Sequence, residues 1–223
     1  MSNPGTLLIF GASRGAGLET ARLARSHGWN VHALVRTASP TLEALDVQQH
    51  VGDALDATRV AEVCAACSDA DAVISTMSGG PVGASADFIG VANAVEGARA
   101  AGIERFLLVS SLGAGESRAH ASERLLQAIG HILEEKTRGE ECLLASGLRH
   151  TVIRPGRLVD ESQPGGGALV EDPGVHGDLG RGDLAELLLA CIKAPQTEGR
   201  IFSSVGRGFL STTANPMPKL LPS

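Results

Sequence analysis

Three glycines near the N-terminus have the spacing of a phosphate-binding turn. Gly11, Gly15 and Gly17 occur in GASRGAG, which follows the apolar run TLLIF and precedes a segment with helical periodicity. Glycine permits a tight turn out of a strand, a close approach of backbone to a diphosphate, and close packing of a helix on a sheet. The first turn of the helix adds free N–H groups and a positive dipole end. The segment predicts a dinucleotide site, the alternative being a purely structural turn.

The charges around this turn favour a phosphorylated dinucleotide. A site for NAD usually has an acidic residue at the end of the second strand, where it binds the ribose 2′-hydroxyl. This chain has Arg36 there, and Arg14 lies inside the glycine turn. Two guanidinium groups suit a 2′-phosphate, which accepts charge-assisted hydrogen bonds. We therefore expect NADP(H) as the cofactor, unless both arginines are ordinary surface residues. Asp53 is expected either to contact the adenine or to cap the next helix.

Polar and small residues follow the later apolar runs of the sequence. Ligands of open α/β sheets bind outside the carboxyl ends of the strands, so these residues are expected along the cofactor. Each serine among them has the alternative role of satisfying the backbone of its own turn. The expected cofactor-binding residues are Gly11, Ser13, Arg14, Gly15, Ala16, Arg36, Asp53, Ala54, Ser75, Thr76, Met77, Ser110, Lys136, Pro155 and Gly156.

Short apolar strands that alternate with helices position these residues. The expected strands are Thr6–Phe10, Asn30–Val35, Val47–Val51, Ala72–Thr76, Arg105–Ser111, His150–Arg154 and Arg200–Val205. The expected helices are Gly15–His27, Thr58–Cys67, Ser85–Ala101, Ala121–Ser146 (interrupted by Gly130 and Gly139) and Asp183–Lys193, with Asp183 as its N-cap. Continuous apolar strands separated by helices are typical of a parallel sheet that is covered on both faces. The predicted fold is α/β, a Rossmann-type doubly wound parallel sheet with a small C-terminal region on the substrate side.

The chain is predicted to form one NAD(P)-binding Rossmann domain over residues 1–205. The segment 155–180 is rich in proline and glycine, so we expect an irregular loop on the substrate side, with a lid function. Residues 206–223, rich in Gly, Ser, Thr and Pro, are expected to form a loosely ordered tail.

Several motifs carry a resemblance to a known superfamily over about residues 6–205. They are GASRGAG, LVR at 34–36, GD at 52–53, VSSLGAG at 109–115, ASGLRHTVIRPGRL at 145–158 and GDLAELLLACI at 182–192. With them the chain resembles the atypical short-chain dehydrogenase/reductase superfamily, and more closely the small NAD(P)-binding proteins typified by biliverdin-IXβ reductase/flavin reductase and NmrA-like proteins. The glycine spacing GxxxGxG is that of classical members of the superfamily, whereas the atypical group more often has GxxGxxG.

The resemblance implies a catalytic serine and a Tyr-x-x-x-Lys motif, but the tyrosine is missing. Ser111, or its neighbour Ser110, matches the serine, and Lys136 matches the lysine that holds the nicotinamide ribose. The tyrosine position is Ile132, and the chain contains no tyrosine. His131 is a candidate substitute proton donor because histidine titrates near neutrality. The expected catalytic residues are therefore Ser111, Lys136 and His131, although His131 and Lys136 have surface or structural roles as alternatives.

Composition narrows the classes of partner. A net charge of −6 disfavours a nucleic-acid surface, and no apolar run approaches the roughly 18 residues of a membrane span. The N-terminus lacks the basic and apolar regions of a secretory signal, so a cytoplasmic chain is expected. Cys64 and Cys67 form a CxxC in an alanine-rich helical stretch without a second ligand pair, and we interpret them as buried apolar side chains. No metal site is predicted.

The residues and the resemblance together favour an enzyme. We expect an NADPH-dependent reductase of an electrophilic small molecule, of the flavin, quinone, tetrapyrrole or conjugated carbonyl type, acting as a monomer or homodimer. Such substrates need little acid catalysis, and the cofactor carries the hydride chemistry. The alternatives are a non-catalytic NADP(H)-binding sensor or regulatory protein, and a redox-neutral isomerase or cyclase.

Overall fold

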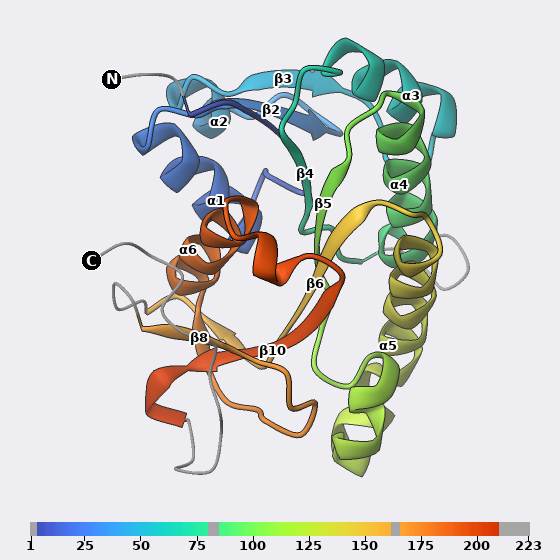
Figure 1. Ribbon diagram of the computed structural model, residues 1–223, viewed down its shortest axis with the longest axis vertical. Helices are drawn as coiled ribbons and strands as arrows, with labels where there is room; N and C mark the ends of the chain where they lie inside the picture. The colour runs from blue at the N-terminus through green and yellow to red at the C-terminus, as the bar shows by residue number, and fades with distance from the viewer. Residues whose placement is uncertain (1–3, 80–84, 162–165, 210–223) are drawn as a thin grey trace.

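One mixed sheet organises the fold (Figure 1). The computed structural model describes residues 4–79, 85–161 and 166–209. Within them, eight strands form a sheet of order β3-β2-β1-β4-β5-β6-β10-β8. Their bounds are β1 Thr6–Phe10, β2 Asn30–Val35, β3 Gln48–Val51, β4 Ala72–Ser75, β5 Arg105–Val109, β6 Arg149–Pro155, β8 Gly167–Val170 and β10 Arg200–Gly206. The order 3-2-1-4-5-6 is that of doubly wound dinucleotide-binding sheets, so the predicted fold is confirmed.

The order of the strands reverses at β1. The chain adds β2 and β3 on one side of β1 and then returns to add β4, β5 and β6 on the other side. β1 pairs in parallel with β2 on one side, where Leu7 lies opposite Val31, and with β4 on the other, where Leu7 lies opposite Ala72. The pairs from β3 through β6 to β10 are all parallel, and β8 pairs antiparallel with β10 at the edge. Ligands of such sheets bind at this reversal point, outside the carboxyl ends of the strands.

Helices cover both faces of the sheet (Figure 1). Helices α1 and α6 pack on one face, and α3, α4 and α5 pack on the other. The helices are α1 Gly15–Ser26, α2 Pro40–Ala44, α3 Ala57–Ala66, α4 Val91–Ala100, α5 Glu123–Leu144 and α6 Arg181–Ile192, with a π-helical turn η1 at Ala86–Gly90 and 3₁₀ turns η2 Gly115–His120, η3 Pro195–Thr197 and η4 Arg207–Phe209. None of the described helices combines the length and apolar character that a membrane span needs.

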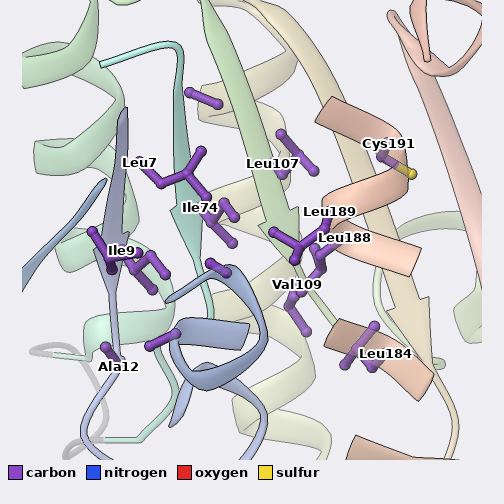
Figure 2. Packing of buried hydrophobic residues seen from close by; sticks show 14 of the residues in the cluster. Leu7, Ile9, Ala12, Ile74, Leu107, Val109, Leu184, Leu188, Leu189 and Cys191 are labelled. Carbon is purple, nitrogen blue, oxygen red and sulfur yellow. The ribbon is translucent and has the colours of Figure 1, made fainter. Parts of the chain in front are cut away.

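The core has two halves because successive side chains of a strand point to opposite faces. Leu7 and Ile9 of β1 are buried against α1 and α6, and Figure 2 shows Leu184 and Leu188 of α6 within this cluster. Leu8 of β1 is buried in the second cluster, against α3 and α4. Full burial of a leucine or isoleucine contributes about 1.5–3 kcal/mol. Because the side chains on both faces of β1 are buried, its sequence is a continuous run of apolar residues after Thr6.

The segment 155–180, predicted to be irregular, contains regular structure, and that prediction was wrong in part. β7 Leu158–Val159 pairs with β9 Leu179–Gly180, and β8 adds an antiparallel edge strand beside β10. β8 consists of only four residues, and its partner strand comes much later in the chain, so no local pattern marks it. Residues 162–165 of this segment lie outside the described part.

Three smaller expectations also changed. The N-cap of α6 is Gly180 and not Asp183, which lies in the first helical turn, where a carboxylate favours the helix dipole. Helix α5 is kinked at Ile129, one residue before the interruption predicted at Gly130, and it has no kink at Gly139, where a second interruption was predicted. The predicted tail starts at Gly206, which is the last residue of β10; η4 follows it, and residues 210–223 lie outside the described part.

Candidate dinucleotide-binding site

A cavity of about 600 Å³ opens at the carboxyl ends of β1 to β6. It collects residues from the turn after each of these parallel strands, at the edge where the doubly wound topology places ligands. Its lining consists of Phe10, Gly11, Ser13, Arg14, Gly15, Ala16, Leu34, Val35, Arg36, Gly52, Asp53, Ala54, Leu55, Thr76, Met77, Ser78, Gly79, Ala86, Val109, Ser110, Ser111, Lys136, Pro155, Gly156, Leu158 and Arg181. Of the residues expected to bind the cofactor or to catalyse, only Ser75 and His131 are absent from this lining.

The glycine turn at the start of α1 is fixed by close packing. A Cβ at Gly17 would lie 2.2 Å from the carbonyl oxygen of Gly11 and 2.4 Å from Oγ1 of Thr76, so only glycine fits. The Thr76 hydroxyl donates to the carbonyls of Phe10 (3.1 Å) and Gly11 (3.2 Å), which ties the turn after β1 to the turn after β4. Thr76 was expected to bind the cofactor, and in the structure its hydroxyl stabilises the turn after β1.

The backbone of this turn has room for a phosphate group. Gly15 has a φ of +56°, and a Cβ there would meet only Nε of Arg181, at 3.7 Å. The N-cap of α1 is Arg14, whose side chain makes no capping hydrogen bond. The first N–H groups of the helix thus face open space with the positive end of the helix dipole behind them. This geometry fits a dinucleotide diphosphate.

Two cations near the glycine turn lack a counter-ion among the described residues. Arg14 and Arg36 are exposed, line the cavity, and form no ion pair with any residue in the described ranges. Asp53 also lines the cavity, and its carboxylate accepts a hydrogen bond from the Leu55 N–H at 3.0 Å. The helix that Asp53 was alternatively expected to cap is capped instead by Asp56, whose side chain accepts from the N–H of Arg59.

Arg181 is a third cation that the sequence analysis missed. It is the first residue of α6 and lines the cavity beside Gly15. Its guanidinium pairs with the exposed carboxylate of Asp160 at 2.6 Å. Only the packing of α6 on α1 places Arg181 there, so no local sequence pattern could have identified it.

Lys136 reaches the opposite end of the cavity from α5. Its Nζ lies 2.7 Å from Oδ1 of Asp87 in η1, and the side chains are only 11% and 2% exposed. The other oxygen of Asp87 accepts from the backbone N–H of Gly79 at 2.8 Å. The ion pair therefore joins α5, η1 and the loop after β4. Lys136 is a largely buried cavity residue, which argues against the alternative of a solvated helix lysine.

The serines expected at the strand ends differ in their hydrogen bonds. Ser111 lines the cavity, but its hydroxyl donates to the carbonyl of Leu112 at 3.0 Å. Ser110 also lines the cavity, is 5% exposed, and its hydroxyl has no hydrogen-bond partner in the described structure. Buried hydroxyls seldom lack a partner. Ser110 is thus the serine that a ligand would satisfy, whereas Ser75 is fully buried away from the cavity.

No histidine is among the described residues that line the cavity. His131 is exposed on α5 and does not line the cavity, so it was wrongly expected to act there. Glu140, on the same helix α5, pairs with Arg154 of β6. Arg154 is buried, and its guanidinium forms a bidentate pair with the Glu140 carboxylate at 3.0 and 2.7 Å. Arg154 is therefore part of the framework.

The fold and the cavity define a dinucleotide-binding protein of the Rossmann type. A family model described as NAD(P)H-binding matches residues 11–195, which is most of the chain. The chain belongs to this NAD(P)H-binding family.

Two relatives and one more distant structure with the same fold are similar to this chain. The structure of the anaerobillin reductase ChuY from Escherichia coli O157:H7 is 34% identical, with a TM-score of 0.84 over 93% of this chain and 100% of that one. An uncharacterized sugar epimerase, YhfK, from Bacillus subtilis (strain 168) is 37% identical over 146 residues, 63% of this chain and 65% of its own. A wide-type short-chain dehydrogenase/reductase from Veillonella parvula, solved with NADP, shares the fold at 13% identity, with a TM-score of 0.74 over 92% of this chain and 96% of its own. The chain spans less than two thirds of the length of the curated relatives it matches.

Proposed function

We propose that this protein is an NADPH-dependent reductase of an electrophilic, conjugated small molecule, with tetrapyrroles as the first class to test. The observation that carries the proposal is a cavity whose β1–β2 end has two arginines without an ion pair to any described residue, and whose other end has an available serine and a largely buried lysine. The Escherichia coli relative, named as an anaerobillin reductase, supports the choice of tetrapyrroles. Flavins, quinones and conjugated carbonyls are the other candidate acceptors.

The residues around the glycine turn would hold the dinucleotide. Backbone N–H groups from Gly15 onward would bind the diphosphate, and Arg14 and Arg36 would bind the 2′-phosphate by charge-assisted hydrogen bonds. Arg181 would add positive charge beside the diphosphate. When bound, the reduced nicotinamide supplies a hydride to the acceptor.

The other end of the cavity would orient the substrate without supplying its proton. Ser110 would donate its hydroxyl to a ligand oxygen, and Lys136 would present a positive charge that Asp87 keeps in place. The described lining has no tyrosine, histidine or cysteine, its arginines stay protonated, and the ammonium of Lys136 is held in its ion pair with Asp87. The proton that accompanies the hydride would therefore come from water. This requirement favours acceptors whose conjugation stabilises the charge that hydride addition creates.

Acceptor-dependent oxidation of NADPH tests the proposal. The protein is mixed with NADPH under anaerobic conditions and with a panel containing a linear tetrapyrrole, FMN, a quinone and a nucleotide sugar. We expect loss of the NADPH absorbance with stoichiometric reduction of the tetrapyrrole. The double variant Lys136→Met/Asp87→Asn, which removes both buried charges together, should lower kcat, whereas Lys193→Met, an exposed lysine outside the cavity, should not.

A second candidate function is a non-catalytic NADP(H)-binding protein. The absence of tyrosine, histidine and cysteine from the described lining favours it. Tight NADPH binding without oxidation by any acceptor in the panel would support this candidate and reject the reductase.

A further inference from the structure

A cluster of metal-binding residue types lies outside the cavity lining, beside the edge strand β3. His32 of β2, His50 of β3 and Cys67, the C-cap of α3, bring their side chains together. Nδ1 of His32 lies 3.0 Å from Nε2 of His50, and Sγ of Cys67 lies 3.3 Å from the first nitrogen and 3.6 Å from the second. Both imidazoles are half-buried, and the cysteine is fully buried.

These distances approach those between ligands of one tetrahedral ion. Zinc binds histidine nitrogen at about 2.0–2.1 Å and cysteine sulfur at about 2.3 Å. Tetrahedral angles then place two nitrogens about 3.3 Å apart and a sulfur about 3.5 Å from each nitrogen. The observed N–N distance is shorter by a few tenths of an ångström, and the two S–N distances lie on either side of the ideal value. Small side-chain rotations are enough to admit an ion between the three atoms.

An apolar strand residue lies opposite each of the two histidines, and the charged groups that act on the rings are Asp69 and Arg59. His32 lies opposite Leu8 of β1 in the sheet register, and Leu34 occupies the next position on the same face of β2. Leu8 and Leu34 belong to the core beneath α3 and α4. Polar rings in such a place need partners. Each ring turns one nitrogen toward the other ring and the cysteine, and this common point is where an ion would sit.

We propose that His32, His50 and Cys67 form a zinc site, with water in the fourth position of a tetrahedron. The site is separate from the dinucleotide cavity and does not depend on the proposed reductase activity. It would join the edge strand β3, the strand β2 and the end of α3. Gly52 and Asp53 directly follow β3 and line the cavity. By fixing the position of β3, the ion would also restrict the motion of these two residues.

The ionisation of the three groups sets how the ion would bind. Burial lowers the pKa of His32, opposed by Asp69, and burial, His32 and Arg59 lower the pKa of His50. Both rings are thus neutral near pH 7, as ligands must be. Burial, with Asp69 adding to it, raises the pKa of Cys67 to about 11, so the free group is a thiol. The ion would displace this proton as its bond to sulfur forms, and binding releases one proton to solvent.

Titration of the metal-free protein with Co²⁺ tests the site directly. Tetrahedral Co²⁺ substitutes for zinc and gives visible absorption, and a bond to thiolate adds a charge-transfer band in the near ultraviolet. We expect one equivalent to bind with both features, and Zn²⁺ to displace it. Cys67→Ser should abolish the charge-transfer band, whereas Cys64→Ser, which removes the other buried thiol of the same helix, should leave it unchanged.

The histidine ligands are tested by affinity. Loss of groups that merely orient ligands costs about 10–100-fold in metal affinity, so His50→Gln should weaken Zn²⁺ binding at least as much. Circular dichroism of each variant establishes that it is folded, and NADPH binding to Cys67→Ser reports on the cavity separately. Absence of stoichiometric Co²⁺ binding, or a charge-transfer band that survives Cys67→Ser, would show that the two rings form only an N–H···N hydrogen bond.

Discussion

The two ends of the cavity use charge in opposite ways. At the β1–β2 end, Arg14 and Arg36 are exposed and have no ion-pair partner in the described structure. In the region around α5, Lys136 pairs with buried Asp87, and Arg154 pairs with buried Glu140. A cation without a protein partner is available to an anionic ligand, whereas a cation that neutralises a buried carboxylate is part of the framework. The first end thus provides affinity, and the second provides rigidity.

The largest effect should come from breaking the framework at Arg154. Arg154→Met leaves the carboxylate of Glu140, whose side chain is 2% exposed, without its partner. Removal of one member of a buried ion pair typically destabilises a protein by about 3–5 kcal/mol. Urea unfolding followed by circular dichroism measures this loss. The matched control is Arg157→Met, because Arg157 is 74% exposed and solvent screens its pairing with Asp178, so little stability should be lost. Equal effects of the two variants would remove the contrast between framework and surface cations.

The next effect should come from the two unpaired arginines, and it should appear in binding and not in stability. Hydrogen bonds to charged groups contribute about 1.5 kcal/mol each at the low end, which suits exposed side chains. Arg14→Ala/Arg36→Ala should therefore cost about 3 kcal/mol of NADPH binding, roughly 150-fold in Kd, and leave NADH almost unchanged. Parallel fluorescence titrations with the two cofactors measure the difference. Equal losses for both cofactors would mean that the arginines do not contact the 2′-phosphate.

Packing of the glycine turn should give a smaller change in stability. Gly17→Ala places a methyl group 2.2 Å from the Gly11 carbonyl oxygen, and such overpacking typically costs about 1–3 kcal/mol. The displaced turn should also lose its affinity for either dinucleotide. Gly130→Ala is the control, since a Cβ there meets only Nη2 of Arg118, at 4.0 Å. We expect its stability to be unchanged or raised by about 0.4–1 kcal/mol in thermal melts. Normal dinucleotide binding by Gly17→Ala would contradict the tight turn.

The smallest effect should distinguish the two neighbouring serines. Ser110→Ala removes a buried hydroxyl without a protein partner, so stability should not fall, but ligand affinity should drop by about 0.5–1.5 kcal/mol. Ser111→Ala removes a hydroxyl that is bound to its own turn, and it should leave affinity nearly unchanged. Calorimetric titration of both variants with NADPH and substrate compares them. The reverse order would identify Ser111 as the ligand-binding residue.

Features carried by adjacent residues could be predicted from the sequence. The turn from Gly11 to Gly17 and the arginine at the end of β2 are such features, because a strand, a turn and a helix follow one another directly. The apolar strands could also be predicted. Strands that are buried on both faces have continuous apolar sequences and not alternating apolar and polar residues. The parallel sheet covered on both faces then followed from the alternation of strands and helices.

Features that depend on residues far apart in the chain could not be predicted. β8 forms because β10 offers it an edge, Arg181 meets Gly15 because α6 packs on α1, and Lys136 is buried because η1 carries Asp87. The cluster of His32, His50 and Cys67 is of the same kind. The spacing of Cys64 and Cys67 directed attention to a CxxC pair, but the structure gives Cys67 two histidine neighbours from other strands. Local patterns contain none of these contacts.

The central claim is that the cavity binds a nicotinamide dinucleotide and holds its 2′-phosphate. Isothermal titration of the unmodified protein with NADPH and with NADH tests it most directly. We predict one site per chain and an affinity for NADPH roughly a hundredfold higher than for NADH. Absence of measurable binding of either dinucleotide, or equal affinities for the two, would contradict the account.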